Sequence, residues 1–407
     1  MKNKEPGRRE FLKDVVLLAG LSGGAFGSAS AQTPATEGVS QSPLMAVRAY
    51  GDRSRFENVS RDWLPSPTGR VTASFTPHQD SRGIITPSAL HFEIHHSRVP
   101  EIDPRQHRLL LHGLVDRSLI FTMADLKRLP SVSRIYFIEC AGNSARLAQR
   151  TAKTVQFTHG LTSCSEWTGV PLSVLLEEAG VQREAQWLVA EGADAVHMTR
   201  SIPLKKALDD VLVAYYQNGE ALRPEQGYPL RLVIPGWEGN TNVKWLRRIK
   251  LVEQPAMTRE ETSHYTDLMP DGAARQFTFA MDPKSVITYP SGGHKLSGPG
   301  YYQITGLAWS GRGGVRSVEI STDGGVNWAS AKLQEPVLRF AHVRFHFDWK
   351  WNGEEALLQS RCTDDRGETQ PALADFIKAR GLLSGYHFNT IQRWRVARDG
   401  SVINALG

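Results

Sequence analysis

The chain has 407 residues, with 48 Lys and Arg, 42 Asp and Glu, and a formal net charge of +6. This length is typical of two globular domains, and the weak, dispersed positive charge does not indicate a nucleic-acid-binding protein. Three cysteines cannot form a disulfide framework, and an odd number leaves at least one thiol unpaired.

Residues 1–31 have the features of an export signal. The pair Arg8 and Arg9 precedes a weakly apolar stretch from Val15 to Phe26, which ends in the small residues Ala29-Ser30-Ala31. The stretch is too short and too rich in glycine to span a bilayer. The arginine pair indicates the twin-arginine route, which exports folded proteins. We therefore predict a periplasmic protein without a membrane span. Removing five basic and three acidic residues with this segment lowers the net charge from +6 to about +4.

Residues 32–85 carry few periodic patterns and many Ser, Pro and Gly residues, which predicts an extended arm over the surface. From residue 88 to about 255, strand and helix patterns mix, so an α+β domain is expected. Its clearest elements are two short helices and two short strands, at residues 123–129, 171–179, 231–234 and 246–252.

After about residue 270 the pattern changes to strands separated by turns. Residues 301–309 read as a strand, and residues 315–321 alternate apolar and polar side chains as a half-buried strand does. Phe345, Phe347 and Trp349 fall at period two, so they form one apolar face. These patterns predict an immunoglobulin-like β-sandwich, although the Cys…Trp…Cys hallmark of antibody domains is missing.

A single cysteine follows a buried strand pattern in the first region. The apolar run from Ile135 to Ile138 leads into Glu139-Cys140-Ala141-Gly142-Asn143, so the Cys140 thiol lies at a rigid strand end where it can bind a metal. Most isolated cysteines are simply small buried hydrophobic residues, and we expect this of Cys164 and Cys362, which have no neighbour at metal-site spacing. No Cys-x-x-Cys-His motif occurs, so we expect no haem on this chain.

Three distant motifs support a metal-binding role for Cys140: Glu191 to Asp194, Gly227 to Arg231, and Asn242 to Leu246. In this order the motifs resemble those of the sulfite oxidase family of molybdenum enzymes. The resemblance implies an α+β molybdopterin domain at 32–270 and an immunoglobulin-like dimerisation domain at 271–407. It also implies a Mo-molybdopterin cofactor with the Cys140 thiolate as a metal ligand, in a homodimer or hetero-oligomer.

The resemblance carries site residues onto this chain. The implied cofactor contacts are Phe92, His95, His96, Cys140, Asp194, Gln226, Arg231, Asn242 and Lys244. An ionised Asp194 accepts hydrogen bonds from the pterin, and Arg231 and Lys244 suit its phosphate. Gln226 stands where the family has a histidine. The implied catalytic residues are Cys140 and Tyr265. Taken singly, such residues are more often packing residues or surface ion-pair partners, so these roles depend on the resemblance.

The chain departs from many sulfite-oxidising relatives where they carry arginines that hold a free anion. Here those places are Ile94 and Ser144-Ala145, and the nearest candidates to replace the charge are Arg98, Arg146 and Arg150. A pocket with fewer fixed charges suits a sulfur atom presented on another molecule better than a small dianion.

Further motifs are similar to the sulfane dehydrogenase branch of the family, at residues 139–144, 224–231 and 235–240. This similarity implies oxidation of sulfane sulfur on a carrier protein by oxygen-atom transfer, with electrons leaving through a separate cytochrome c subunit. Three alternatives remain at this stage. They are a periplasmic dehydrogenase of free sulfite, a methionine sulfoxide reductase, and a non-catalytic exported binding protein, which would contain no molybdenum.

Overall fold

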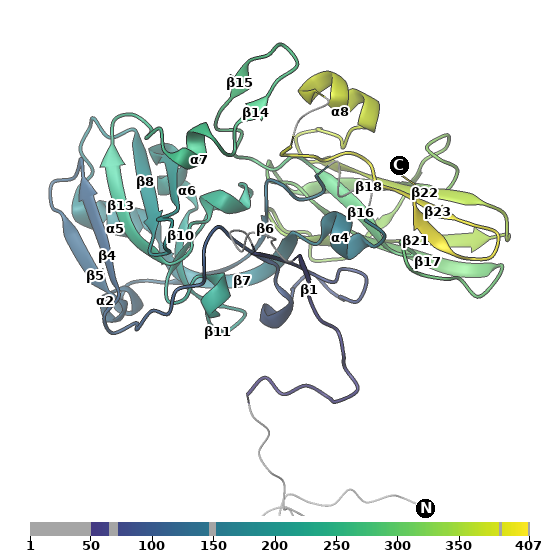
Figure 1. Cartoon of the computed structure of the whole chain (residues 1–407), viewed down its shortest axis with the longest axis horizontal. Helices are drawn as coiled ribbons and strands as arrows, with labels where there is room; N and C mark the ends of the chain where they lie inside the picture. The colour runs from purple at the N-terminus through teal and green to yellow at the C-terminus, as the bar shows by residue number, and fades with distance from the viewer. Residues whose placement is uncertain (1–49, 65–71, 146–151, 382–384, 406–407) are drawn as a thin grey trace, which may run out of the picture. The chain divides into compact units, whose positions relative to one another are not determined.

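The computed structural model describes residues 50–64, 72–145, 152–381 and 385–405 (Figure 1). Two units are present, divided after Glu57. In the described part of the first unit, the Glu57 amide donates to the Ser54 carbonyl oxygen (2.9 Å). The predicted export signal lies outside the described residues. None of the described helices combines the length and apolar character needed to cross a membrane.

The second unit, residues 58–407, contains two domains. Its first domain begins with a three-stranded antiparallel sheet, β1-β2-β3. Its strands are β1 (Asp62–Leu64), β2 (Thr72–Phe75) and β3 (Glu93–His95). Ala73 and Phe75 are buried, so the prediction of a surface arm over residues 32–85 is wrong for this part. Strands of three or four residues are too short to show a period-two pattern, and β2 is held by pairing with β3, which is distant in the sequence.

Two five-stranded sheets complete the first domain. One has the order β11-β10-β7-β6, with β12 beside β10, and the other has the order β5-β4-β13-β8-β9. Their strands are β4 (Arg108–Gly113), β5 (Leu119–Thr122), β6 (Val132–Glu139), β7 (Thr162–Pro171), β8 (Trp187–Gly192), β9 (Thr199–Pro203), β10 (Leu212–Gln217), β11 (Glu220–Ala221), β12 (Arg231–Val233) and β13 (Leu246–Val252). The predicted strands at 231–234 and 246–252 are confirmed.

Short helices connect these strands. The α-helices are α2 (Met123–Arg128), α4 (Val155–His159), α5 (Leu172–Ala179), α6 (Leu204–Asp209) and α7 (Arg259–Thr262), and the 3-10 helices are η1 (Ser88–Leu90), η2 (Pro224–Gln226) and η3 (Gly239–Thr241). Helix α2 begins with a capping box in which Thr122 and Asp125 satisfy each other's backbone amides. Helix α5 ends at Gly180, whose φ of 70° is readily adopted by glycine. Both predicted helices are confirmed.

The second domain is a β-sandwich, as the strand patterns predict. Its sheets have the orders β16-β17-β21-β20 and β19-β18-β22-β23-β24. The strands are β16 (Lys284–Tyr289), β17 (Gly300–Trp309), β18 (Val315–Ser321), β19 (Ala329–Ser330), β20 (Lys332–Leu333), β21 (Val343–Trp351), β22 (Ala356–Asp364), β23 (Arg393–Val396) and β24 (Val402–Asn404). Helix α8 (Leu373–Arg380) lies between β22 and β23. A small hairpin, β14 (Asp267–Leu268) with β15 (Ala274–Arg275), precedes the sandwich.

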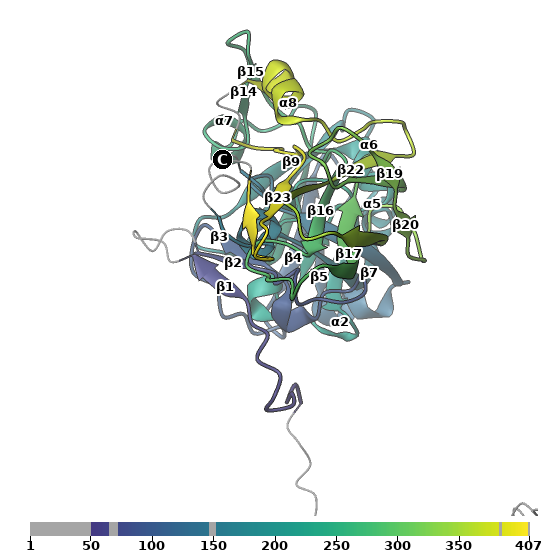
Figure 2. The ribbon, with the colours of Figure 1, turned by 90° about the vertical axis from the view of Figure 1, so that its right-hand side faces the viewer.

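The sandwich core continues into the first domain. Leu307 of one sheet and Val318 and Trp394 of the other belong to a single apolar cluster, which also contains Phe137 and Val155 from the first domain. Figure 2 has the sandwich nearest the viewer, with β16 and β17 of one sheet and β22 and β23 of the other labelled. Because β6 carries Phe137, the strand that leads to Cys140 is anchored in this shared core.

Candidate functional site

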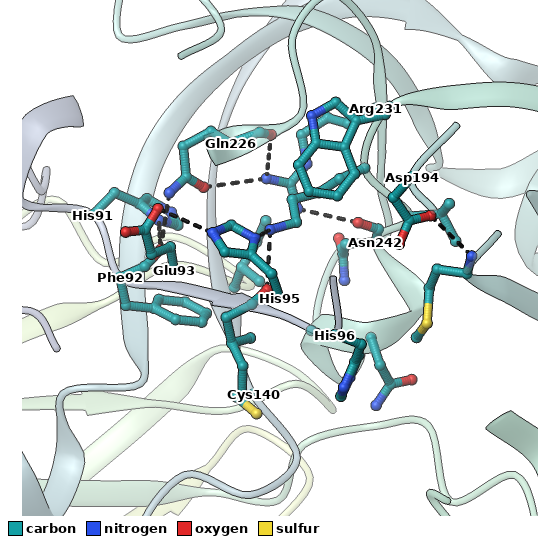
Figure 3. Close-up of a pocket in the computed structure, with 18 of the residues that line it drawn as sticks. His91, Phe92, Glu93, His95, His96, Cys140, Asp194, Gln226, Arg231 and Asn242 are labelled. Carbon is teal, nitrogen blue, oxygen red and sulfur yellow. Dashed lines mark hydrogen bonds and ion pairs between the residues drawn. The ribbon is translucent and has the colours of Figure 1, made fainter. Parts of the chain in front are cut away.

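One pocket of the first domain brings together all ten residues that the sequence predicts for the site. They are Phe92, His95, His96, Cys140, Asp194, Gln226, Arg231, Asn242, Lys244 and Tyr265. They come from the β3 segment, the end of β6, the loop after β8, η2, β12, the segment before β13 and the segment after α7. In Figure 3 the Cys140 sulfur and His96 lie toward one end of the pocket, and Gln226 and Arg231 lie toward the other.

Cys140 follows the last residue of β6, and hydrogen bonds fix its loop. The Asn143 amide donates to the Cys140 carbonyl oxygen (2.9 Å), and the Cys140 amide donates to the Leu161 carbonyl oxygen (2.9 Å). Burial raises the pKa of the Cys140 thiol to about 11, so the thiol keeps its proton at neutral pH unless a cation binds the sulfur. A Cβ added to Gly142 would meet only this sulfur within 4 Å, at 3.9 Å. The space beside the sulfur is therefore open.

Tyr265 lies near Cys140 and is paired with His96, whose Nε2 is 2.8 Å from the phenolic oxygen. Burial raises the pKa of Tyr265 well above its usual value, and burial lowers the pKa of His96. At neutral pH the phenol is therefore protonated and the imidazole uncharged. Tyr265 also has a φ of 42°, which is uncommon for a residue other than glycine and is found repeatedly at functional sites. This end of the pocket offers neutral hydrogen-bonding groups.

The other end of the pocket holds two buried cations. The Arg231 guanidinium donates to the carbonyl oxygens of Gln226 (2.9 Å) and Asn242 (3.1 Å). Lys244 Nζ donates to the Ile94 carbonyl oxygen (3.0 Å) and to His95 Nδ1 (2.7 Å). No ion pair to a carboxylate is present for Arg231 or Lys244 among the described residues. Burial lowers the pKa of Arg231 to about 9, and burial together with the nearby Arg231 lowers the pKa of Lys244 to about 7.

Asp194, Gln226 and Asn242 are buried in the pocket wall. The Asp194 carboxylate accepts hydrogen bonds from the Met198 amide (3.0 Å) and from Ser97 Oγ (3.3 Å). Gln226 Nε2 donates to the Phe92 carbonyl oxygen (2.9 Å). The Asn242 side chain bonds only to backbone groups and to Thr241, so its contribution to the pocket is to orient the carbonyl that receives Arg231.

Two residues that contact the predicted site residues were not predicted from the sequence. The first is Glu93, whose carboxylate Oε2 lies 3.2 Å from His95 Nε2. Because Lys244 donates to the other ring nitrogen, His95 carries its proton on Nε2 and donates it to Glu93. The two-residue spacing of Glu93 and His95 on one strand face was the pattern that would have revealed this pair.

The second missed residue is Arg200 on β9, which is 1% exposed. Its guanidinium carbon lies 5.1 Å from the centre of the Tyr265 ring, and it forms ion pairs with Glu238 and Glu261, each at 3.2 Å. It also donates to Asn240 Oδ1. Two carboxylates neutralise this arginine, so it adds no net positive charge beside Tyr265. Its partners lie far along the chain, and no local pattern reveals them.

Of the three arginines predicted to replace the missing charge, only Arg98 lies within the described residues. Arg98 lines a separate surface hollow together with Arg61 and Trp63, and it does not line the pocket of Cys140. Arg146 and Arg150 lie outside the described residues. Ile94 lines the pocket, and Ser144 is buried.

The residues fit a molybdopterin. A thiol with open space beside it suits a soft metal ion. Two buried cations that form no direct ion pair with a carboxylate of the described residues are suited to donate to a phosphate group in this low-dielectric site. The cofactor when bound supplies redox-active molybdenum for oxygen-atom transfer. Cys140 would hold the metal, while Arg231 and Lys244 would hold the phosphate at the opposite end.

Comparisons with known proteins agree with this geometry. Residues 96–260 match the family model of the oxidoreductase molybdopterin binding domain, and residues 275–393 match that of the Mo-co oxidoreductase dimerisation domain. The fold and the site thus define a molybdopterin-binding oxidoreductase.

A solved structure, the sulfane dehydrogenase SoxCD from Paracoccus pantotrophus, is 45% identical, with a TM-score of 0.85 over 92% of this chain and 96% of that chain. Mitochondrial sulfite oxidase from Mus musculus is 31% identical and is matched over 76% of this chain and 61% of its own length. NADH nitrate reductase from Ulva prolifera is 31% identical, over 79% of this chain and 42% of its own length. The chain therefore spans only about half of these two curated relatives. It belongs to the sulfite oxidase family and is similar to its sulfane dehydrogenase members.

The low pKa of Lys244 predicts a pH dependence for phosphate binding to the cofactor-free chain. Lys244 is charged below its pKa of about 7 and loses its positive charge as the pH rises through that value. We expect calorimetry with inorganic phosphate to give a Kd that rises at least about tenfold from pH 6 to pH 8.5, relative to Lys244→Arg, because one charge-assisted hydrogen bond is lost. The ratio to Lys244→Arg cancels the titration of phosphate itself. A pH-independent ratio would contradict the assignment of Lys244 to the anion site.

Proposed function

We propose that the chain is the molybdenum subunit of a periplasmic enzyme that oxidises sulfane sulfur attached to a carrier protein. Electrons would leave through a cytochrome c subunit, since we expect no haem on this chain. The family assignment supports an oxidoreductase and disfavours the alternative of a non-catalytic binding protein. The similarity to a sulfane dehydrogenase along nearly the full chain supports the choice of substrate.

The observation that carries this proposal is the charge distribution in the pocket. Arg231 and Lys244 are its only Arg or Lys lining residues within the described part of the chain, and both are committed to the end that fits the cofactor phosphate. Near Cys140 the wall has Ile94, His96 and Tyr265, none of which carries a positive charge at neutral pH. Among the described lining residues no cation lies there to balance the charge of a free sulfite dianion, whereas a sulfur atom on a protein arm needs none.

The side chains near Cys140 have distinct roles in this proposal. The Cys140 sulfur fixes the metal, and the surrounding apolar wall limits the access of water. The protonated Tyr265 phenol would donate its one hydrogen bond to an oxygen atom of the reacting group, and neutral His96, with its proton on Nε2, would donate to the phenolic oxygen and orient it. Arg200 holds the Tyr265 ring from behind by a cation–π contact.

Three further parts of the proposal concern the whole protein. We propose that the twin-arginine segment at 1–31 directs export of the folded chain and is then removed, which leaves residues 32–407. We also propose a molybdopterin domain at 32–270 and a dimerisation domain at 271–407. The two family matches, at 96–260 and 275–393, support a boundary near residue 270. The dimerisation description of the second match supports a homodimer or a hetero-oligomer.

Restoring positive charge tests the substrate assignment. In Ile94→Arg/Ala145→Arg we expect the KM for free sulfite to fall at least about tenfold, because a charged hydrogen bond contributes about 1.5 to 3 kcal/mol. The rate with carrier-bound sulfane sulfur should not improve. The measurement is kcat/KM for both substrates with cytochrome c as acceptor, in protein of equal molybdenum content.

The matched control, Ala329→Arg/Ile403→Arg, places two arginines at exposed positions of the sandwich. It should leave kcat/KM unchanged for both substrates. Suppose that the wild type prefers free sulfite and that the KM for sulfite does not fall in the pocket variant. The protein would then be a sulfite dehydrogenase in which Arg146 or Arg150 supplies the positive charge. That result would refute the carrier-bound substrate.

A further inference from the structure

A second cleft, with a volume of about 610 Å³, lies outside the molybdopterin pocket. We call it the arginine cleft. Tyr136 of β6 and Trp237 contribute to it from the first domain, and Phe340 contributes from the sandwich. The volume is within the range of about 300 to 1,000 Å³ found for specific binding sites. None of the ten predicted site residues lines it.

Backbone contacts between the two domains give the cleft its shape. The Phe137 amide donates to the Phe340 carbonyl oxygen (2.7 Å), and the Met281 amide donates to the Gly236 carbonyl oxygen (3.0 Å). A Cβ on Gly236 would collide with the backbone of Gly311, and a Cβ on Gly311 would collide with the backbone of Gly236. The walls are thus fixed by close packing of main chain, so little ordering is needed when a partner binds.

Aromatic rings form the apolar part of the cleft. Trp237 is half-buried and stacks on Phe279, with ring centres 4.2 Å apart and an interplanar angle of 9°. Tyr136 and Phe340 have ring centres 6.5 Å apart. Lys206 Nζ lies 5.5 Å from the centre of Trp237 and 5.4 Å from that of Phe340. The rings therefore hold rigid positions and keep part of their surface open.

The rim of the cleft carries an excess of positive charge. Five Lys or Arg residues and two Asp residues line it, which leaves a net charge of +3. Arg134, Arg339 and Arg366 are exposed, and no carboxylate of the described residues forms an ion pair with any of them. Arg312 differs, because it pairs with Asp282 (2.8 Å) and Glu368 (3.1 Å). Three guanidinium groups thus remain available to an acidic partner.

We propose that the arginine cleft binds an acidic polypeptide segment of a partner protein, with one apolar side chain of that segment against the aromatic rings. Trp, Tyr and Arg dominate the energetically important positions of protein interfaces, and this cleft combines them. A small anion would need donors that converge on one point, whereas these arginines come from three separate segments, β6 and the residues before β21 and after β22. The inference does not depend on the proposed function.

The cleft and the molybdopterin pocket are built on the same two chain segments. Tyr136 lies on β6, four residues before Cys140, which directly follows that strand. Trp237 lies two residues before Gly239, which lines the molybdopterin pocket. A segment seated in the cleft would therefore lie against the two chain segments that shape the metal-binding loop.

The test uses a fluorescein-labelled peptide of six glutamates with one central phenylalanine, titrated with the full chain and followed by fluorescence anisotropy. We expect saturable 1:1 binding that weakens with salt. Arg134→Glu/Arg339→Glu/Arg366→Glu should weaken it at least about tenfold. The control Arg183→Glu/Arg275→Glu/Arg316→Glu makes the same change of net charge at exposed positions elsewhere, and it should stay within about twofold of wild type.

Replacing the central phenylalanine of the peptide by glycine should also weaken binding, because the aromatic contact is lost. Absence of saturable binding, or an equal loss in both triple variants, would overturn the proposal. The last measurement is the oligomeric state of the wild type and of the cleft variant without peptide, by analytical sedimentation. A change of oligomeric state confined to the cleft variant would assign the cleft to a second copy of this chain and would also overturn it.

Discussion

Replacement of Cys140 by serine is expected to abolish turnover, with a loss of more than about 100-fold, because even residues that only support a metal ligand cost 10- to 100-fold when changed. Serine has nearly the size of cysteine, so the loop hydrogen bonds of the backbone remain. Its hydroxyl is a hard ligand with a much higher pKa than a thiol and is a poor substitute at a soft metal. X-ray absorption should find one sulfur fewer around molybdenum.

Cys164→Ser is the matched control. Cys164 is likewise a buried thiol, but it lies on β7 and does not line the pocket. We expect this variant to lose some stability while keeping its molybdenum and the full sulfur coordination. An unchanged sulfur count in Cys140→Ser would refute the metal-ligand assignment, and an equal loss of molybdenum in both variants would show that the effect is one of folding.

Replacement of Lys284 by methionine is expected to destabilise the chain and to loosen the metal-binding loop. Lys284 Nζ lies 2.6 Å from the carboxylate of Glu139, and both side chains are at most 1% exposed. Trp309 Nε1 (2.7 Å) and Asn143 Nδ2 (2.9 Å) donate to the same carboxylate. Removing the lysine leaves a buried negative charge unbalanced, at a cost of about 3 to 5 kcal/mol, which lowers the Tm of a chain of this length by about 4 to 7 °C.

The loop effect is specific because Glu139 directly precedes Cys140. Lys284→Met should therefore retain less molybdenum during dialysis against a chelator, and Glu139→Gln/Lys284→Met should recover much of the stability by removing the unpaired charge. Arg380→Met is the comparison, since it breaks partly buried ion pairs with Asp282 away from the loop. If Lys284→Met and Arg380→Met retain metal equally at matched stability, the lysine has no special role at Cys140.

Local motifs, interpreted through the resemblance to the sulfite oxidase family, predicted the residues that line the pocket. The apolar run before Cys140 placed the thiol at a strand end, and the spaced motifs around Asp194, Arg231 and Lys244 supplied the residues that line one pocket with it. The alternation in residues 315–321 was enough to predict β18, because a strand with one buried face imposes its period on the chain. Such patterns depend on neighbours only a few residues apart.

Other features were decided only by the tertiary structure. The pair of Glu139 with Lys284 joins positions 145 residues apart, and Arg200 reaches Tyr265 from a strand with no distinguishing pattern. The arginine cleft forms from side chains of two domains, each unremarkable within its own segment. A buried charge is stable only where a partner satisfies it in space, and the sequence gives no measure of that distance. The chain itself therefore determined which groups can perform the chemistry, and the fold decided which charges are neutralised and which remain free to bind.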